Sequence, residues 1–126
     1  MARLLIVEDD PNQCLLYEQE FKAAGHEVVT ARDGREAIDL AAQVEPDLVV
    51  MDISMPGMDG IEAMSRMLAR NHKLPIILNT AYATYKDNFR AWSADAYVVK
   101  SSDLTELKNA IKKVLESRQS SPRAGP

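Results

Sequence analysis

The stretch LLIVEDD at residues 4–10 decides the fold, because an unbroken apolar run is followed at once by three acidic residues. Short apolar runs recur at 28–29, 48–51, 75–78 and 97–99. Most of these runs do not alternate apolar and polar residues, which is typical of strands covered on both faces of a parallel sheet. We therefore expect five buried strands.

Amphipathic stretches separate the apolar runs and predict helices. Asp10, Asp33, Asp59 and Asp103 stand where N-cap residues are expected, just before apolar residues at helical spacing. A further helix is expected at about 84–92, where the pattern is least regular. Alternating strands and helices predict a single α/β domain with right-handed crossovers.

The chain's size and charge limit what it can be. Its 126 residues suit one domain, which we place at 1–117, and residues 118–126 are expected to be a disordered tail or truncated linker. No apolar run approaches the roughly 20 residues of a membrane span. The net charge of −4 argues against nucleic acid or membrane partners. A single cysteine, Cys14, excludes an internal disulfide and fits the cytoplasmic location that we expect.

Acidic, hydroxyl and amine groups stand at the ends of four predicted strands. Asp9 and Asp10 follow the first strand, Asp52 the third, Thr80 ends the fourth and Lys100 the fifth. Because the carboxyl ends of parallel strands meet at one edge of a sheet, we expect these groups to converge there. Each residue alone would have an ordinary role as a cap, a turn residue or a solvated charge. Their conjunction predicts a site.

The chemistry of these groups favours a divalent cation and a phosphoryl group. Crowded carboxylates repel one another, and a hard cation such as Mg²⁺ resolves that conflict. An aspartate can attack phosphorus to give an acyl phosphate. Lys100 and the hydroxyl of Thr80 could contact phosphoryl oxygens, and the small Ala81 would leave room beside them. The two histidines, His26 and His72, lie outside the pattern, which argues against zinc.

Taken together, the motifs resemble the receiver domain of response regulators over residues 2–116. The matching stretches are LIVEDDP at 5–11, DG at 33–34 with EA at 36–37, PDLVVMD at 46–52, MPGMDG at 55–60, TA at 80–81 and YVVK at 97–100. The resemblance implies a flavodoxin-like (βα)5 domain, doubly wound, with five parallel strands in the order 2-1-3-4-5.

The resemblance also implies a mechanism. Asp52 would accept a phosphoryl group from a sensor histidine kinase or a histidine phosphotransfer protein in a two-component phosphorelay. Mg²⁺ would be held by Asp9, Asp10, Asp52 and the backbone carbonyl of Ser54. The domain would catalyse only its own phosphorylation and dephosphorylation, so we do not expect an enzyme with a separate substrate.

A switch is implied as well. Phosphorylation of Asp52 would draw Thr80 toward the new charge, and Tyr97 would turn inward to fill the space. The reshaped face would comprise the fourth predicted helix, the fifth strand and the fifth helix. It would control a partner protein or an output domain outside this chain.

Residues near the acceptor are expected to govern water access to the phosphoryl group. These are Ser54, Ala81 and Tyr82, of which the bulky Tyr82 would prolong the phosphorylated state. Ser101 follows Lys100 where many family members have proline, often with a cis bond. Since a cis bond before a non-proline residue costs about 3–4 kcal/mol, we do not expect one here.

Three alternatives remain at this point. An aspartyl-phosphate phosphatase acting on small molecules would commonly use Asp-x-Asp, but Ser54 stands in the second position. A flavodoxin-like cofactor module would need a glycine-rich loop in place of the acidic residues at 9–10. A receiver-like interaction module that takes no phosphate is the third. No helix-turn-helix motif or basic recognition helix follows Glu116, so direct binding of nucleic acid is not expected.

Overall fold

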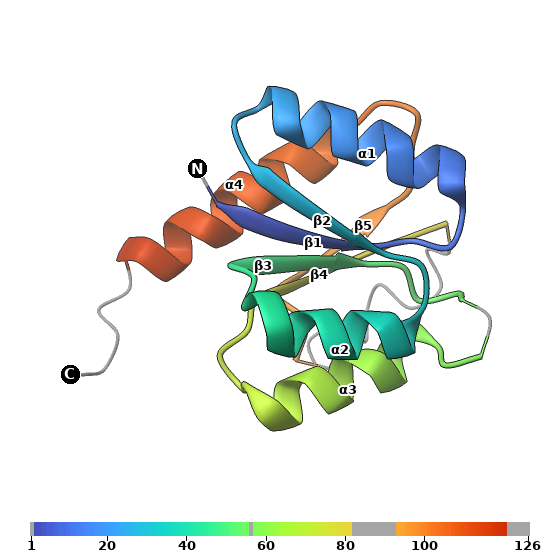
Figure 1. Cartoon of the computed structure of the whole chain (residues 1–126). Coiled ribbons are helices and arrows are strands. Elements are labelled where there is room, and N and C mark those ends of the chain that lie inside the picture. The colour runs from blue at the N-terminus through green and yellow to red at the C-terminus, as the bar shows by residue number, and fades with distance from the viewer. Residues whose placement is uncertain (1, 56, 82–92, 121–126) are drawn as a thin grey trace.

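The structure, a computed structural model, describes residues 2–55, 57–81 and 93–120, with side chains described to residue 117. Figure 1 shows one twisted sheet between two layers of helices. The strands are β1 (Arg3–Val7), β2 (Glu27–Ala31), β3 (Leu48–Met51), β4 (Ile76–Thr80) and β5 (Ala96–Val99). All neighbouring strands pair in parallel, in the order β2-β1-β3-β4-β5. The predicted sheet and its strand order are confirmed.

Helices cover both faces of this sheet. They are α1 (Pro11–Ala23), α2 (Gly34–Val44), α3 (Gly60–Arg70) and α4 (Thr105–Ser120). In Figure 1, α1 and α4 lie on one face, and α2 and α3 on the other. Two apolar clusters agree with this layering, since one includes Phe21 of α1 with Leu107 of α4, and the other Ala37 of α2 with Met64 of α3.

Two predicted segments reach into parts of the chain that the structure does not describe. The helix expected at 84–92 lies outside the described residues, so α4 corresponds to the fifth predicted helix. It runs to Ser120, three residues into the segment expected to be disordered, and residues 121–126 lie outside the described part. Within that described part, no peptide bond is cis and no helix has the length and apolar character of a membrane span.

Aspartate caps fix where the helices begin. The Asp33 and Asp59 carboxylates each accept a hydrogen bond from the backbone N–H three residues later, at 2.8 Å. Asp10 accepts one from the N–H two residues later, at 2.9 Å, and Asp103 accepts one from Thr105 at 2.9 Å. These bonds satisfy N–H groups that have no partner inside the helix. The chain therefore turns into each helix within a few residues of leaving a strand.

The first residue of α3 packs against the backbone at Asp52. The Gly60 N–H donates to the carbonyl of Ile53 at 2.8 Å. A Cβ on Gly60 would overlap the carbonyl oxygen of Asp52 and would lie 2.8 Å from the Ile53 Cα. Backbone atoms cannot rotate away as a side chain can, so only glycine fits here without displacing the segment that carries Asp52.

Replacing Gly60 by alanine should therefore destabilise the fold by about 2 kcal/mol, within the usual range for overpacking. Gly34 is a matched control, because it also opens a helix behind an aspartate cap and gains the same helix propensity. Its added Cβ would lie 3.2 Å from the Cβ atoms of Ala63 and Met58 and from the Met58 carbonyl oxygen, which is tight but leaves more room than at Gly60. Urea unfolding of both variants should show the larger loss for Gly60→Ala, and equal stabilities would contradict this packing argument.

Candidate functional site

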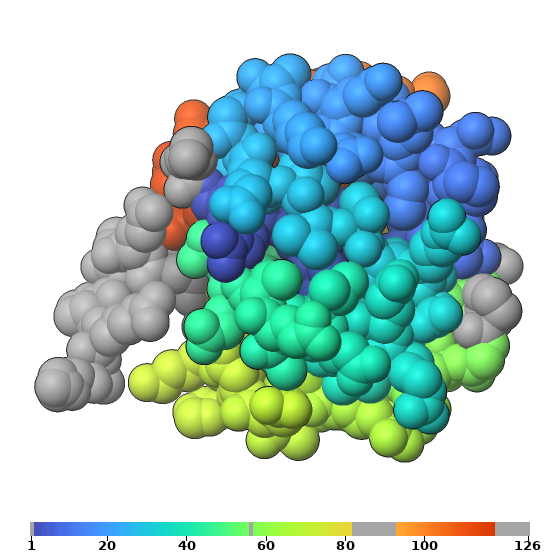
Figure 2. Space-filling model, in the orientation of Figure 1, coloured from blue at the N-terminus to red at the C-terminus, as the bar shows by residue number. Residues whose placement is uncertain are grey.

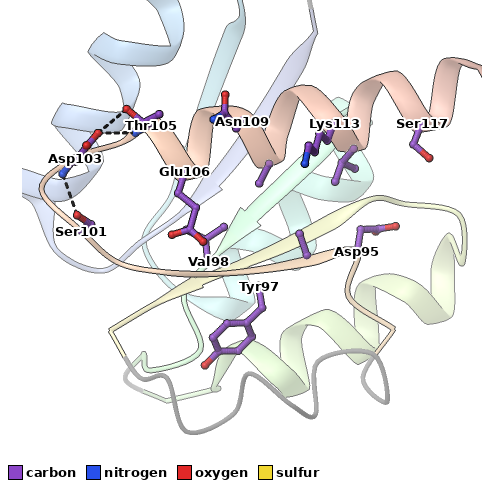
Figure 3. Close-up of a pocket in the computed structure, with 13 residues that line it drawn as sticks. Asp95, Tyr97, Val98, Ser101, Asp103, Thr105, Glu106, Asn109, Lys113 and Ser117 are labelled. Atoms are coloured by element: carbon purple, nitrogen blue, oxygen red, sulfur yellow. Dashed lines mark hydrogen bonds between the residues drawn. The ribbon is translucent and has the colours of Figure 1, made fainter.

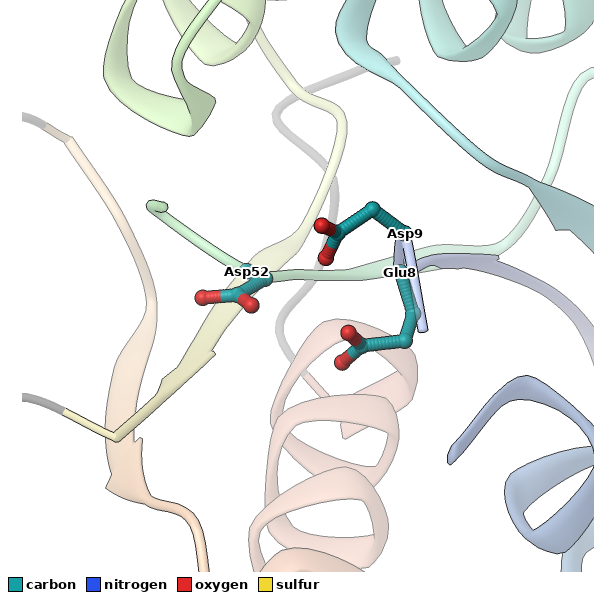
Figure 4. Close-up of side chains that lie close together, drawn as sticks. All are labelled: Glu8, Asp9 and Asp52. Atoms are coloured by element: carbon teal, nitrogen blue, oxygen red, sulfur yellow. The ribbon is translucent and has the colours of Figure 1, made fainter. Parts of the chain in front are cut away.

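Three carboxylates meet at the carboxyl edge of the sheet. Glu8 and Asp9 follow β1, and Asp52 follows β3. One oxygen from each residue lies within 4.8 Å of those of the other two, and Figure 4 shows the three side chains clustered together. Glu8 and Asp52 are 2% and 5% exposed, whereas Asp9 faces solvent. The group is thus a partly enclosed cluster of oxygen donors.

Glu8, and not Asp10, joins Asp9 and Asp52, which corrects the expected meeting of three aspartates. Glu8 continues the pairing of β1, since its N–H donates to the carbonyl of Ala31 at 3.0 Å. Asp10 is the N-cap of α1, and its Oδ1 accepts from the Asn12 N–H at 2.9 Å. Its carboxylate is therefore used in starting the helix.

The sequence already indicates that Glu8 belongs to the acidic cluster. Asp10 precedes Pro11, and an aspartate before proline fits an N-cap followed by the first helical residue. Assigning Asp10 to that role leaves Glu8 and Asp9 as the two acids that directly follow the strand.

Lys100 bridges the two buried carboxylates. Its Nζ lies 2.6 Å from Glu8 Oε1 and 2.8 Å from Asp52 Oδ2. Burial alone would lower the pKa of Lys100, but its hydrogen bonds to Asp52 and Glu8 outweigh burial and raise that pKa. Burial raises the pKa of Glu8, because desolvation exceeds the opposing effect of the hydrogen bond from Lys100. The ammonium is therefore held in its charged form between the two acids.

The remaining predicted site residues lie around this group. Thr80 ends β4, is fully buried, and its carbonyl accepts from the Lys100 N–H at 2.7 Å. The Ser54 N–H donates to Asp52 Oδ1 at 3.2 Å, and Ala81 is exposed directly after β4. Tyr82 lies outside the described residues. The access roles predicted for Ser54, Ala81 and Tyr82 remain predictions.

Tyr97, the predicted switch residue, is 5% exposed in this structure. Its ring belongs to the apolar cluster on the α2 and α3 face, and Figure 3 shows the ring on the other side of β5 from α4. A hollow of about 840 Å³ lies between β5 and α4. It forms part of the expected output face, of which the helix at 84–92 lies outside the described residues. The switch itself remains a prediction.

Comparison with known proteins now decides the family. The response regulator receiver domain matches residues 4–112. The chain is a response-regulator receiver domain. The acidic cluster and Lys100 lie at the carboxyl edge of this domain, where the sequence motifs predicted the site.

Curated proteins of differing length are similar to this chain. Sporulation initiation phosphotransferase F of Bacillus subtilis is 32% identical over 115 residues, which cover 90% of this chain and 93% of that protein. Regulatory protein AtoC of Escherichia coli is 40% identical over 116 residues, covering 90% of this chain but 25% of AtoC. PrrA of Mycobacterium tuberculosis is 34% identical over 120 residues, which cover 94% of this chain and 52% of PrrA. The chain thus spans a quarter of the length of AtoC and about half of the length of PrrA.

Solved structures agree with the fold. The response regulator TrrA from Thermotoga maritima, in complex with Mg²⁺ and BeF, superposes with a TM-score of 0.85 at 40% identity. That match covers 90% of this chain and 99% of TrrA. TrrA bound to histidine kinase ThkA gives a TM-score of 0.84 at 41% identity, and that match covers 91% of this chain and 99% of TrrA.

Removing the ammonium should destabilise the receiver at neutral pH. Lys100→Met leaves Glu8 and Asp52 buried without their shared cation, and such a loss costs about 3 kcal/mol. Chemical unfolding in a chelating buffer should show this loss at pH 7. The loss should shrink in acid, where the carboxylates take up protons. A variant as stable as the parent at pH 7 would show that the bridge contributes nothing.

Removing the charge of Glu8 should stabilise the fold, whereas removing the Lys100 ammonium should destabilise it. Because its pKa is raised, the folded protein binds a proton on Glu8 more tightly than the unfolded chain does. Protonated Glu8 therefore favours folding. This contribution to stability is complete below the ordinary pKa of 4.5 and is lost as pH rises through the raised pKa of the folded protein. Glu8→Gln, which cannot ionise, should gain about 1 kcal/mol at pH 7 and nothing in acid. A loss of stability at pH 7 would overturn this assignment.

Proposed function

We propose that this receiver accepts a phosphoryl group on Asp52 in a two-component phosphorelay. The observation that carries the proposal is the Lys100 ammonium, 2.8 Å from the Asp52 carboxylate at the edge of an acidic cluster. An ammonium in this position can pair with the carboxylate before transfer and with a phosphoryl oxygen after it. The TrrA complex with Mg²⁺ and BeF supports this proposal by similarity.

The donor set fits Mg²⁺, which prefers oxygen ligands and usually binds one or two carboxylates together with a phosphate. We assign direct ligation to Asp9, Asp52 and the carbonyl of Ser54. Glu8 is kept as the partner of Lys100, whose Nζ lies closer to Glu8 Oε1, at 2.6 Å, than to Asp52 Oδ2, at 2.8 Å. Asp10 was predicted as a ligand, but its role as helix cap disfavours it. When bound, the ion would neutralise charge on the transferring group.

Transfer begins when a carboxylate oxygen of Asp52 attacks the phosphorus of a phosphohistidine. The new P–O bond forms as the P–N bond breaks, and the imidazole leaves with the electron pair and is protonated. Lys100 then pairs with a phosphoryl oxygen while Glu8 keeps its charge compensated, and the Thr80 hydroxyl donates to another oxygen. Water later attacks the phosphorus of the acyl phosphate, which releases inorganic phosphate and regenerates the Asp52 carboxylate. The chain acts on no separate substrate, so we do not class it as an enzyme.

The partners follow from the same chemistry. The donor is a histidine kinase or a histidine phosphotransfer protein, as the complex of TrrA with kinase ThkA supports. The target is a protein or an attached output domain that reads the face at β5 and α4. We expect these encounters in the cytoplasm, without direct contact with nucleic acid. An interaction module that takes no phosphate is the competing reading, and phosphorylation distinguishes the two.

Mass spectrometry after incubation with acetyl phosphate and Mg²⁺ tests the acceptor. The parent should gain one phosphoryl group, and Asp52→Asn or a chelator should abolish the gain, because the nucleophile or the ion is then missing. Labelling that persists in Asp52→Asn would move the acceptor elsewhere, and an unlabelled parent would favour the interaction module.

Magnesium affinity separates Asp9 from Asp10. Asp9→Asn should weaken binding of Mg²⁺ about tenfold or more, because it removes a charged ligand. Asp10→Asn is the matched control, since asparagine caps a helix as well as aspartate and the charge change is the same. Its effect should stay within about threefold, as for a nearby charge in water. Calorimetric titration with Mg²⁺ measures both, and the reverse order would restore Asp10 as the ligand.

A further inference from the structure

A buried polar pair lies beside the site and has no part in the scheme above. Asn79 of β4 donates from its Nδ2 to the Tyr17 hydroxyl oxygen of α1 at 3.0 Å. Tyr17 is 1% exposed and Asn79 is 3% exposed, and Tyr17 packs in the apolar cluster between the sheet, α1 and α4. Apolar side chains could fill this space without requiring any hydrogen bond. Packing alone therefore does not explain why two polar side chains are buried here.

Strand alternation places this pair under the site. Val50, Ile77 and Val98 belong to the cluster on the α1 and α4 face. Residues two positions later on the same strands point to the same face, because side chains alternate along a strand. Asp52, Asn79 and Lys100 therefore share that face.

Lys100 has to cross β4 to reach its partners. It follows β5, whereas Asp52 follows β3, and β4 lies between these strands. Met51 pairs with Leu78, so Asn79 is the β4 neighbour of Asp52. The Lys100 side chain therefore spans β4. It starts beside Thr80, whose carbonyl accepts the Lys100 N–H at 2.7 Å, and its ammonium ends 2.8 Å from Oδ2 of Asp52, the residue whose β4 neighbour is Asn79.

We propose that Tyr17 and Asn79 are positioning residues for Lys100. Tyr17 holds the Asn79 amide toward α1, so that its N–H groups do not compete with the ammonium for the carboxylates of Glu8 and Asp52. The role of the pair in phosphoryl transfer rests on the proposed function, but its effect on Lys100 does not.

Electrostatics link the pair to the site. Burial raises the pKa of the Tyr17 hydroxyl, opposed by the hydrogen bond from Asn79 and by the charge of Lys100. The hydroxyl therefore stays protonated and remains an uncharged partner for the amide. Without that hydroxyl, the buried Asn79 amide loses its acceptor, and such a group is costly to leave unpaired. The carboxylates on the same face are the acceptors toward which it would turn.

Tyr17→Phe tests the proposal directly. NMR of the Lys100 side chain in the unphosphorylated protein should show a shifted Nζ or Cε resonance. The rate of phosphorylation by acetyl phosphate should fall roughly tenfold, a loss that a small misplacement can cause. Phe21→Leu is the control, because Phe21 stacks on Tyr17 with ring centroids 6.0 Å apart but lies one helical turn further along α1. It should lower the melting temperature without moving the Lys100 signal.

The double variant Tyr17→Phe/Asn79→Leu supplies the rescue. Because both polar partners are gone, no amide competes for the carboxylates, and the Lys100 resonance and the rate should return toward those of the parent. An unmoved Lys100 resonance in Tyr17→Phe, or a double variant no better than Tyr17→Phe, would overturn the proposal. Failure of the parent itself to take up a phosphoryl group would refute the proposed function, and the Lys100 resonance would still decide the role of the pair.

Discussion

The structure of the site depends on one ammonium shared by two buried carboxylates. Glu8 and Asp52 lie on adjacent strands, and their negative charges could not both remain buried there without a cation. Lys100 supplies it from β5, two strands away from β3. This requirement ties the function to the strand order, because β4 must lie between the strand that carries the lysine and the strand that carries the aspartate.

Sharing the ammonium also suits a site whose charge changes. If Lys100 paired with Asp52 alone, leaving that carboxylate for a phosphoryl oxygen would break its buried ion pair. With Glu8 at 2.6 Å, the ammonium keeps one partner throughout. The raised pKa of Glu8 marks the cost of this arrangement, since burial disfavours the charged carboxylate more than Lys100 favours it. The cluster thus sacrifices some stability to keep a cation at the acceptor, a compromise common at functional sites.

Sequence patterns were sufficient for the architecture and for most of the site. Continuous apolar runs marked the five strands, and aspartates before the helices marked the caps that the structure confirms. Parallel strands then brought Asp52 and Lys100 to one edge. Glu8 was missed because three successive acids follow β1 and Asp10 was counted both as a helix cap and as a ligand. Its position before Pro11 favours the cap, which leaves Glu8 and Asp9 for the site.

The Tyr17 and Asn79 pair could not be anticipated from the sequence. Tyr17 fits the apolar face of a helix, and Asn79 reads as a polar residue near the end of a strand. They are 62 positions apart, and only the packing of α1 on the sheet brings them within 3.0 Å. Side-chain pairs of this kind depend on the crossing of a helix over a strand, which no local pattern encodes.

A crystal structure of this chain grown with Mg²⁺ and beryllofluoride tests the central claim most directly. The account predicts beryllofluoride on a carboxylate oxygen of Asp52, Mg²⁺ bound by Asp9 and Asp52, and Lys100 in contact with both a fluorine and Glu8. Beryllofluoride on another residue, a magnesium ion bound by Asp10 in place of Asp9, or Lys100 turned away from the group would contradict it.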